Sequence, residues 1–318
     1  MQCLKRNQEK YYKQCLFYTP RKGANVAHTS VIANNKGGVS KTELTVQLAA
    51  ALARRNLRLL VVDMDPQANA TRRLGVEWDA SDPIPTMSEV IKADQIGAGE
   101  GAVVACGWTL PDGTPTLEAG LIDVLPARFD LINRETEAGV VGAIRRLKKA
   151  LEGWTEDYDV ILIDTRPDLG HLVQMAMATA DTVIIPTDPN YDSIEAAIRV
   201  TDFVGRHAVD LANPGLTVGG IVVTRRKATS EQDYQVEGLA AQFGDLVWNF
   251  GGVVTLPDGS ELLNPPHIPE WSRFAEADAA AASLSDWNDR NGRKTVALFD
   301  AVARTYESRF LSANGIAA

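Results

Sequence analysis

The sequence predicts an α/β protein in which a doubly wound, mostly parallel sheet is flanked by helices on both faces. Three observations predict it. Short runs rich in β-branched residues alternate with longer amphipathic stretches, from about residue 28 to residue 311. Several of these runs are almost continuously apolar, as strands buried on both faces are. Polar residues follow directly after them, and ligands of open parallel sheets bind at that edge.

Composition narrows the class of protein. The chain has 318 residues, of which 45% are hydrophobic and 23% charged, as is ordinary for a soluble globular protein. The longest apolar runs fall short of the ~20 residues that span a bilayer, and the N-terminus lacks the apolar core of a secretory signal. Three cysteines are too few for a disulfide framework. We therefore expect a cytoplasmic protein without stable membrane association.

Charge is distributed unevenly along the chain. Residues 1–30 contain six Lys or Arg and one Glu, a net charge of +5, so the remainder of the −9 chain carries −14. We expect a basic N-terminal arm over residues 1–26, followed by a single domain over residues 27–318. The arm could contact DNA or another anionic surface. Alternatively, it is a solvated terminus, or a leader foreign to the native chain.

The first strand–helix unit contains the strongest motif. A strand is expected from about His28 to Asn34, and an amphipathic helix from Leu44 to Arg55. A glycine-rich loop, called the phosphate loop below, connects them. It reads Asn34-Asn35-Lys36-Gly37-Gly38-Val39-Ser40-Lys41-Thr42-Glu43. Loops of this kind cradle phosphates with backbone N–H groups and a helix N-terminus.

The phosphate loop departs from the usual pattern G-x-x-x-x-G-K-[ST], because the two glycines fall on Asn35 and Ser40. Gly37 and Gly38 still allow the backbone to approach phosphate oxygens. Lys41 would place a charge on the β- and γ-phosphates of ATP. The hydroxyl of the next residue, Thr42, could ligate Mg²⁺. The alternative is a plain glycine-rich turn between strand and helix.

Two carboxylates follow the next expected strand, Leu57 to Val62. They are Asp63 and Asp65, at the start of the segment 63–71. One such carboxylate can orient the attacking water in phosphoryl transfer. We assign Asp65 to the water and Asp63 to a supporting position near the metal. The alternative is that at least one of them only caps the following turn.

A third carboxylate, Asp164, ends the apolar strand that begins at Tyr158. A strand-end Asp in this position can hold Mg²⁺ directly or through water. The alternative is an ordinary helix cap or loop aspartate.

The remaining elements follow in order. We expect a helix over Met87–Lys92, a hairpin over 109–117, a strand over Leu121–Leu125, a helix over Val140–Leu151, a helix over Leu172–Ala180, a strand over Thr182–Pro186, a helix over Ile194–Val204, a strand over Gly219–Thr224, a helix over 230–243, a hairpin over Val253–Leu263 and a helix over Lys294–Leu311.

A second lysine, Lys36, stands near the start of the phosphate loop. In a single loop, a lysine this early does not easily reach the phosphates that Lys41 contacts. Across a face-to-face dimer it could neutralise transition-state charge on the partner's nucleotide, as an arginine finger does in trans. This predicts nucleotide-dependent dimerisation.

These motifs together resemble a known family. Residues 36–42 resemble the deviant Walker A loop of the ParA/MinD group of P-loop ATPases. Residues 63–71 are similar to the ParA-type segment with Asp-x-Asp-Pro-Gln and Asn-Ala-Thr, 123–127 to the strand before the family's Asn-x-x-Leu, and 158–170 to its Walker B region. The resemblance covers about residues 28–285.

The resemblance implies a ParA-type partition ATPase that hydrolyses ATP slowly. Such a protein forms a homodimer around Mg²⁺-ATP, binds DNA non-specifically in the ATP state, and is stimulated by a centromere-binding adaptor protein. The family's phosphate contacts map onto residues 36–43, Val39 among them. Its adenine contacts map onto Thr224, Arg225 and Pro269.

Several residues depart from the family pattern. Ser40 replaces a glycine that lies close to the partner subunit, and Glu43 replaces a threonine beside the Mg²⁺-binding hydroxyl. Glu43 could favour the helix N-terminus or compete for the metal. Arg166 and Asp168 replace a Pro and a Ser; Arg166 could approach phosphate, or the two could pair with each other.

Two other functions remain open. Ser40 and Glu43 could disable hydrolysis, leaving a nucleotide-dependent dimerisation switch or scaffold. A MinD-like positioning ATPase would end in a short basic amphipathic helix, and residues 310–318 carry no such charge. DNA binding rests on clusters of basic residues. They are the arm, residues 225–227, Arg290, Arg293, Lys294, Arg304 and Arg309.

Overall fold

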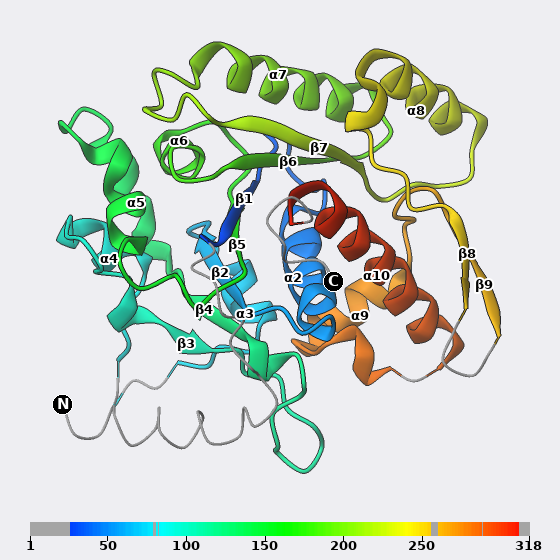
Figure 1. Cartoon of the computed structure of the whole chain (residues 1–318), viewed down its shortest axis with the longest axis horizontal. Helices are drawn as coiled ribbons and strands as arrows, with labels where there is room; N and C mark the ends of the chain where they lie inside the picture. The colour runs from blue at the N-terminus through cyan, green and yellow to red at the C-terminus, as the bar shows by residue number, and fades with distance from the viewer. Residues whose placement is uncertain (1–25, 79–80, 82, 256–259, 288, 312–318) are drawn as a thin grey trace.

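Seven strands form one central sheet in the computed structural model, which describes residues 26–311 except 79, 80, 82, 256–259 and 288. The strand order is β3-β4-β2-β5-β1-β6-β7 (Figure 1). The strands are β1 (His28–Ile32), β2 (Leu59–Met64), β3 (Val104–Ala105), β4 (Ile122–Leu125), β5 (Val160–Thr165), β6 (Thr182–Thr187) and β7 (Thr217–Val223). All neighbours pair in parallel except β3 with β4. The doubly wound fold is therefore confirmed, and the expected arm lies outside the described residues but for Val26.

Helices cover both faces of this sheet (Figure 1). They are α2 (Lys41–Arg54), α3 (Asn69–Arg73), α4 (Met87–Ala93), α5 (Arg146–Leu151), α6 (His171–Met177), α7 (Tyr191–His207), α8 (Ser230–Phe243), α9 (Ser272–Ala280) and α10 (Arg290–Phe310). One core lies among α2, α9, α10 and the sheet, and another among α4 to α8 and the opposite face. Because side chains alternate along a strand, Leu59 and Val61 enter the first core while Leu60 and Val62 enter the second.

The structure differs locally from the sequence predictions. The helix expected over Val140–Leu151 begins as α5 only at Arg146, after a short 3-10 turn, because Gly142 adopts a positive φ of 81° that an α-helix does not accommodate. The edge strand β3 and the short helix α3 were not predicted. Both hairpins are present: Thr109 pairs with Pro115, and β8 (Gly252–Thr255) pairs with β9 (Glu261–Asn264).

The order of the central strands positions the site. Strand β5 lies between β1 and β2, with Ile32 opposite Asp164 and Asp63 also opposite Asp164. Because these strands are parallel, their carboxyl ends meet at one edge of the sheet. The phosphate loop and the two strand-end aspartates are therefore neighbours.

A search of the helices in the described part of the chain found none whose length and apolar character would let it cross a membrane.

Candidate nucleotide-binding site

The phosphate loop joins β1 to α2 through two residues with positive φ. Gly38 has φ 79°, and Ser40, the residue before α2, has φ 59° and ψ 33°. A left-handed conformation costs an L-residue with a Cβ about 1–2 kcal/mol, and the Ser40 side chain makes no capping hydrogen bond in return. The sequence identified Ser40 as a departure, and the structure adds that its backbone is strained.

Lys41 is buried at the first position of α2, where it is 7% exposed. Its Nζ donates to the backbone oxygen of Lys36 at 3.1 Å. Burial lowers the pKa of Lys41, and the nearby negative charges of Asp164 and Asp65 oppose that shift. The ammonium group is therefore held inside the loop by acidic neighbours before any ligand binds.

Asp164 is fully buried at the end of β5 and accepts two hydroxyl hydrogen bonds. The Thr42 Oγ1 donates to its Oδ2 at 2.8 Å, and the Thr45 Oγ1 lies 3.0 Å from its Oδ1. Burial raises the pKa of Asp164 to about 6, although both hydroxyls favour the charged form. The sequence analysis missed Thr45, which lies three residues after Thr42 and hence on the same face of α2.

Asp63 lies beside Asp164 and is also fully buried. Its Oδ1 accepts the backbone N–H of Asp65 at 3.0 Å, while its Oδ2 accepts the backbone N–H and the hydroxyl of Thr71 at 2.9 and 2.7 Å. Burial and the charge of Asp164 raise the pKa of Asp63 to about 7. Both carboxylate oxygens of Asp63 thus accept hydrogen bonds from the protein. These bonds connect the turn after β2 to α3.

Asp65 is 7% exposed and lies near enough to Lys41 and Asp164 for its charge to act on both. Its Oδ1 accepts the backbone N–H of Gln67 at 2.9 Å. Both members of the Asp63–Asp65 pair thus accept a backbone N–H of the following turn, Asp63 from Asp65 and Asp65 from Gln67. This contact does not remove Asp65 from the edge of the sheet where the phosphate loop lies.

Lys36 lies at the outer end of the phosphate loop. Its side chain is 43% exposed, and its Nζ is 3.5 Å from Oδ2 of Asp192, in the first turn of α7. The backbone N–H of Lys36 donates to Oδ1 of Asn34 at 3.0 Å. The backbone of Lys36 is thus fixed by the loop, while its charged group lies against an exposed acid on a different element.

The residues expected near adenine lie beside the phosphate loop. The Thr224 hydroxyl is 3.3 Å from the backbone oxygen of Val39, and Nη1 of Arg225 donates to the backbone oxygen of Gly38 at 2.8 Å. Residues 268–270, called the adenine segment below after the role that the resemblance implies, run alongside residues 223–226, with Pro269 bridged to Arg226. The structure therefore brings Thr224 and Arg225 to the loop, and Pro269 lies beside Arg226.

Glu43 lies in the first turn of α2 and faces a different group of charges from Thr42. Burial raises its pKa to about 7, with Arg73 and Arg225 lowering it and Asp278 and Asp188 raising it. These neighbours belong to α3, α9 and the ends of β6 and β7. The interactions of Glu43 thus point towards those elements.

Arg166 pairs with acidic side chains. Its Nε is 2.5 Å from Oδ2 of Asp168, and its Nη1 is 3.3 Å from Oε1 of Glu135. Glu135 also accepts the backbone N–H of His171 at 2.7 Å, at the start of α6. The pairing alternative for Arg166 and Asp168 is confirmed.

The site offers two hard oxygen donors for Mg²⁺, the Thr42 hydroxyl and the Asp164 carboxylate. Among the residues that the structure describes, no three His, Cys, Asp or Glu side chains form a metal-binding group. Mg²⁺ is commonly held by one or two carboxylates together with water and substrate phosphates. The donor set at Thr42 and Asp164 therefore fits Mg²⁺ bound jointly with a nucleotide.

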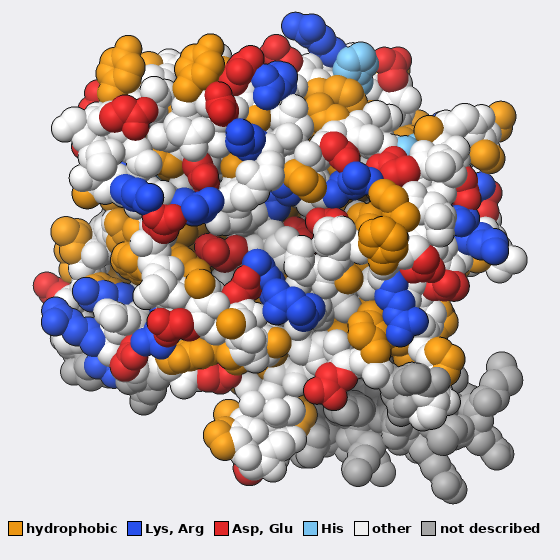
Figure 2. All heavy atoms as spheres, turned by 180° about the vertical axis from the view of Figure 1, so that it is seen from behind, with side chains coloured by type: hydrophobic (Ala, Val, Ile, Leu, Met, Phe, Trp, Pro, Cys, Tyr) orange, Lys and Arg blue, Asp and Glu red, His pale blue; other side chains and the backbone are white. Residues whose placement is uncertain are grey.

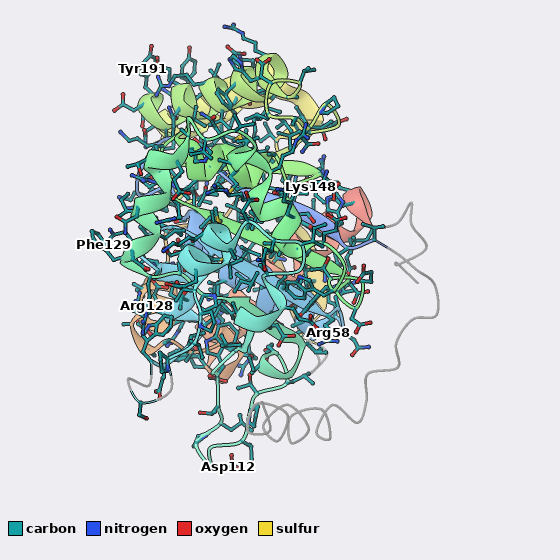
Figure 3. The ribbon with its side chains drawn as sticks, turned by 90° about the vertical axis from the view of Figure 1, so that its left-hand side faces the viewer. Arg58, Asp112, Arg128, Phe129, Lys148 and Tyr191 are labelled. Atoms are coloured by element: carbon teal, nitrogen blue, oxygen red, sulfur yellow. The ribbon has the colours of Figure 1, made fainter. Side chains whose placement is uncertain are left out.

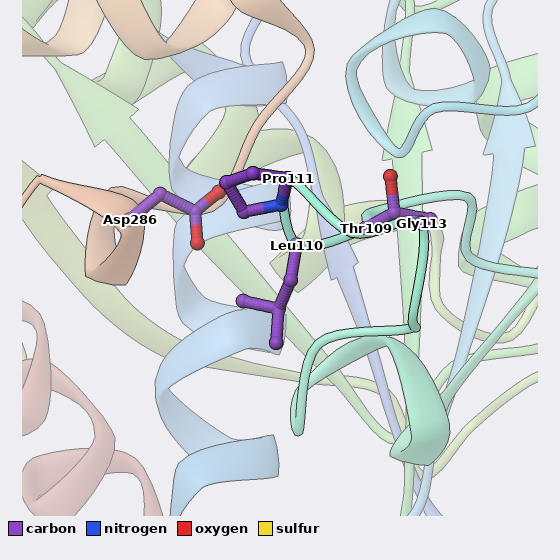
Figure 4. A pocket seen from close by; sticks show the side chains of 5 residues that line it. All are labelled: Thr109, Leu110, Pro111, Gly113 and Asp286. Carbon is purple, nitrogen blue, oxygen red and sulfur yellow. The ribbon is translucent and has the colours of Figure 1, made fainter.

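Two hollows open in another part of the surface. One, of about 530 Å³, is lined by Thr109, Leu110, Pro111, Gly113 and Asp286 (Figure 4). A second, of about 400 Å³, adjoins it and is lined by residues including Arg72, Gly75, Glu77 and Ala281. Neither hollow is lined by a residue of the phosphate loop or by the carboxylates near Lys41. The candidate nucleotide-binding site is therefore placed at the phosphate loop and not at these hollows.

Comparisons with known proteins agree with this geometry. A family described as "AAA domain" matches residues 27–217. An uncharacterised protein of Mycobacterium tuberculosis is 30% identical over 92% of this chain and 82% of its own length. The chromosome partitioning protein ParA of Myxococcus xanthus is 34% identical over 67% of this chain and 70% of its own.

Solved structures give the same fold. An ATP complex of McdA from Cyanothece superposes with a TM-score of 0.69 at 22% identity, covering 88% of this chain and 96% of that one. The family match spans more than half of the chain and includes the phosphate loop and the strand-end aspartates. The chain belongs to the ParA/MinD group of P-loop ATPases.

Proposed function

We propose that this protein is a slow Mg²⁺-dependent ATPase of the partition type, which dimerises around ATP and binds DNA in that state. One observation carries the proposal. The Thr42–Asp164 pair, with a 2.8 Å hydrogen bond, adjoins a buried Lys41, while Lys36 of the same loop is half-exposed. The loop thus offers one lysine to its own nucleotide and a second to another molecule.

Each residue of the site has a role in this proposal. The backbone N–H groups of Gly37 to Glu43 and the Lys41 ammonium bind the phosphates. Thr42 and Asp164 would hold Mg²⁺, which supplies neutralisation of phosphate charge when bound. Asp65 orients the attacking water, and Asp63 supports it by fixing the backbone N–H of Asp65.

Exposed aromatic side chains support a dimer face at the edge where Lys36 lies. Tyr191 and Phe129 are each 70% exposed, and Figure 3 shows them on one edge of the molecule together with Arg128. Tyr191 follows β6 and Phe129 follows β4, so both stand beyond the carboxyl ends of parallel strands. Tyr191 also precedes Asp192, the partner of Lys36.

The proposal of non-specific DNA binding depends on clusters of basic residues. The structure shows that some of these residues already form ion pairs within the protein. Within residues 225–227, Arg225 and Lys227 pair with Glu270, and Arg226 pairs with Asp233. Figure 2 shows basic and acidic side chains interspersed over one face of the molecule. Arg309 of α10 also has a partner, the backbone oxygen of Asp245. We assign DNA contact to Arg290, Lys294 and Arg304 of α10 and to the arm, which lies outside the described residues.

The dimer and the switch are tested by light scattering with ADP and with a slowly hydrolysed ATP analogue. We expect a monomer with ADP and a dimer with the analogue. DNA binding should require the analogue and weaken steeply with salt, because phosphate contacts release counterions. Equal DNA binding with ADP would reject the switch. A centromere-binding adaptor, when added, should accelerate hydrolysis.

A second candidate function is a nucleotide-dependent scaffold with little turnover. The strained Ser40 backbone favours it, because Ser40 lies inside the phosphate loop. ATPase assays with and without DNA separate the two functions. Turnover in either assay supports the partition ATPase, and its absence in both supports the scaffold.

The tail that bears on a MinD-like function lies mostly outside the described residues.

A further inference from the structure

Two consecutive residues after β7 contact two consecutive carbonyl groups of the phosphate loop. Nη1 of Arg225 donates to the backbone oxygen of Gly38 at 2.8 Å. The Thr224 hydroxyl lies 3.3 Å from the backbone oxygen of Val39 and 3.2 Å from Oδ1 of Asp188. Thr224 is buried. These contacts join the end of β7 to the loop itself.

The orientation of these carbonyl groups matters for phosphate binding. A phosphate loop binds with its N–H groups, so its carbonyl groups have to point away from the anion. Gly38 has φ 79°, a conformation that glycine reaches freely and from which it can also depart easily. A charged donor on the Gly38 oxygen holds that peptide in one orientation, since charge-assisted hydrogen bonds are roughly twice as strong as neutral ones.

Two acids also contact the same guanidinium. Nη2 of Arg225 donates to Oε1 of Glu270 at 2.9 Å, and Nη1 is 3.5 Å from Oδ2 of Asp188. Glu270 belongs to the adenine segment. Arg225 itself has φ 51°, a left-handed conformation that is uncommon outside glycine. Arg225 thus bridges the phosphate loop and the adenine segment from a strained backbone position.

We propose that Arg225, assisted by Thr224, is a positioning residue that holds the phosphate loop in its anion-binding conformation and couples it to the adenine segment. The proposal rests on the proposed function, because it assumes that the loop binds a nucleoside triphosphate. It gives Arg225 a different role from the adenine contact that the family resemblance implies. Arg225 acts on the triphosphate through the loop, whether or not a base is present.

Inorganic tripolyphosphate tests this role, because it carries the phosphates of ATP without the base. Binding of Mg²⁺-tripolyphosphate and of Mg²⁺-ATP is measured by calorimetry for the full-length wild type and Arg225→Gln. We expect the variant to weaken binding of both ligands by a similar factor of roughly 3 to 5, because the Arg225 side chain is 44% exposed and solvent screens its hydrogen bonds. Weaker ATP binding with unchanged tripolyphosphate binding would make Arg225 a base contact and overturn the proposal.

Lys227→Gln is the matched control. Lys227 is the other cation on Glu270, at 2.9 Å, so this variant disturbs the same acid while the Arg225–Gly38 bond remains. We expect unchanged affinity for tripolyphosphate. An equal loss in Lys227→Gln would show that the charge balance around Glu270 matters rather than the loop contact, and it would overturn the proposal.

Two milder variants keep the proposal testable if Arg225→Gln does not fold. Arg225→Lys retains one cationic donor that cannot bridge Gly38 and Glu270 together, and Thr224→Val removes only a hydroxyl. Each should give a smaller, parallel loss for both ligands, and a loss for ATP alone contradicts the proposal. Failure of the wild type to bind Mg²⁺-ATP would instead reject the proposed function.

Discussion

The phosphate loop has a lysine at each end, and the two lysines lie in different surroundings. Lys41, at the inner end, is buried and adjoins Asp164 and Asp65, which offset the cost of burying its charge. Lys36, at the outer end, is half-exposed and pairs with Asp192 at 3.5 Å. Exposed ion pairs of this kind are worth about 0–1 kcal/mol. The inner lysine is therefore fixed before binding, whereas the outer lysine can exchange its partner at little cost.

Replacing the outer lysine gives the largest expected effect. Lys36→Ala should bind Mg²⁺-ATP within a few-fold of the wild type but lose hydrolysis by roughly 10³-fold, the lower range for a catalytic cation supplied in trans. The measurements are ATP affinity, ATPase rate and dimer mass with an ATP analogue. Asp192→Asn is the control, because it removes the ion pair but keeps Lys36. Loss of ATP binding in Lys36→Ala would place this lysine in cis.

Replacing the inner lysine should have the opposite signature. Lys41→Met keeps much of the buried volume but removes the charge that meets the phosphates in the proposed function. We expect Mg²⁺-ATP binding to weaken by about 10- to 100-fold, from the loss of charge-assisted hydrogen bonds worth roughly 1.5–3 kcal/mol. Calorimetric titration measures it. If Lys41→Met and Lys36→Ala were indistinguishable in ATP affinity, the distinction between the two ends of the loop would be wrong.

Most of the fold could be predicted because its strands are buried on both faces. An apolar run such as the one ending at Asp164 reads as a strand without reference to the rest of the chain. Strand β3 (Val104–Ala105) could not be predicted, since two residues at a sheet edge carry no periodicity. The late start of α5 depends on the backbone of Gly142, and one glycine within a helical pattern does not specify its φ.

The site divides in a similar way. The sequence predicts that Asp63 and Asp164 both end strands at one edge of the sheet. It does not specify that β5 lies between β1 and β2, which puts Asp63 opposite Asp164. Thr45 could also have been found, because its spacing from Thr42 places it on the same helix face. The bond between Arg225 and Gly38 joins positions 187 apart and depends on a left-handed backbone at Arg225. No local pattern encodes such a contact.

A substitution of Thr45 tests the role of the inner end of the phosphate loop without replacing either lysine. Thr45→Val is nearly isosteric and removes the hydroxyl 3.0 Å from Oδ1 of Asp164. We expect the Mg²⁺ concentration for half-maximal ATPase activity to rise by about 10-fold, with a smaller change in the maximal rate. The Thr45 hydroxyl also lies 3.0 Å from the backbone oxygen of Lys41, four residues earlier in the helix. Thr201→Val is the control, because the Thr201 hydroxyl makes the same kind of bond at 3.0 Å but lies in α7, outside the site. Unchanged Mg²⁺ dependence in Thr45→Val would count against a positioning role.

The smallest expected effect concerns Ser40, which lies between the two lysines. Ser40→Gly removes a Cβ from a backbone with φ 59°, so the free energy of unfolding should rise by about 1 kcal/mol, or roughly 2 °C in Tm. Ser40→Ala keeps the Cβ and should give no gain. Equal stabilisation by Gly and Ala would mean that the hydroxyl, rather than the backbone, causes the cost.

The same variant bears on the outer end of the loop, because the resemblance places residue 40 near the partner subunit. Ala68, which precedes α3, has φ 53° and carries the same kind of backbone strain outside the phosphate loop. Ala68→Gly should therefore stabilise the monomer as Ser40→Gly does, but only Ser40→Gly should lower the concentration at which the ATP analogue gives half-maximal dimer. If both variants shifted dimerisation equally, monomer stability would explain the shift. If neither did, the Ser40 side chain would be no obstacle to the dimer, and the slow hydrolysis proposed for this chain would need a cause outside residue 40.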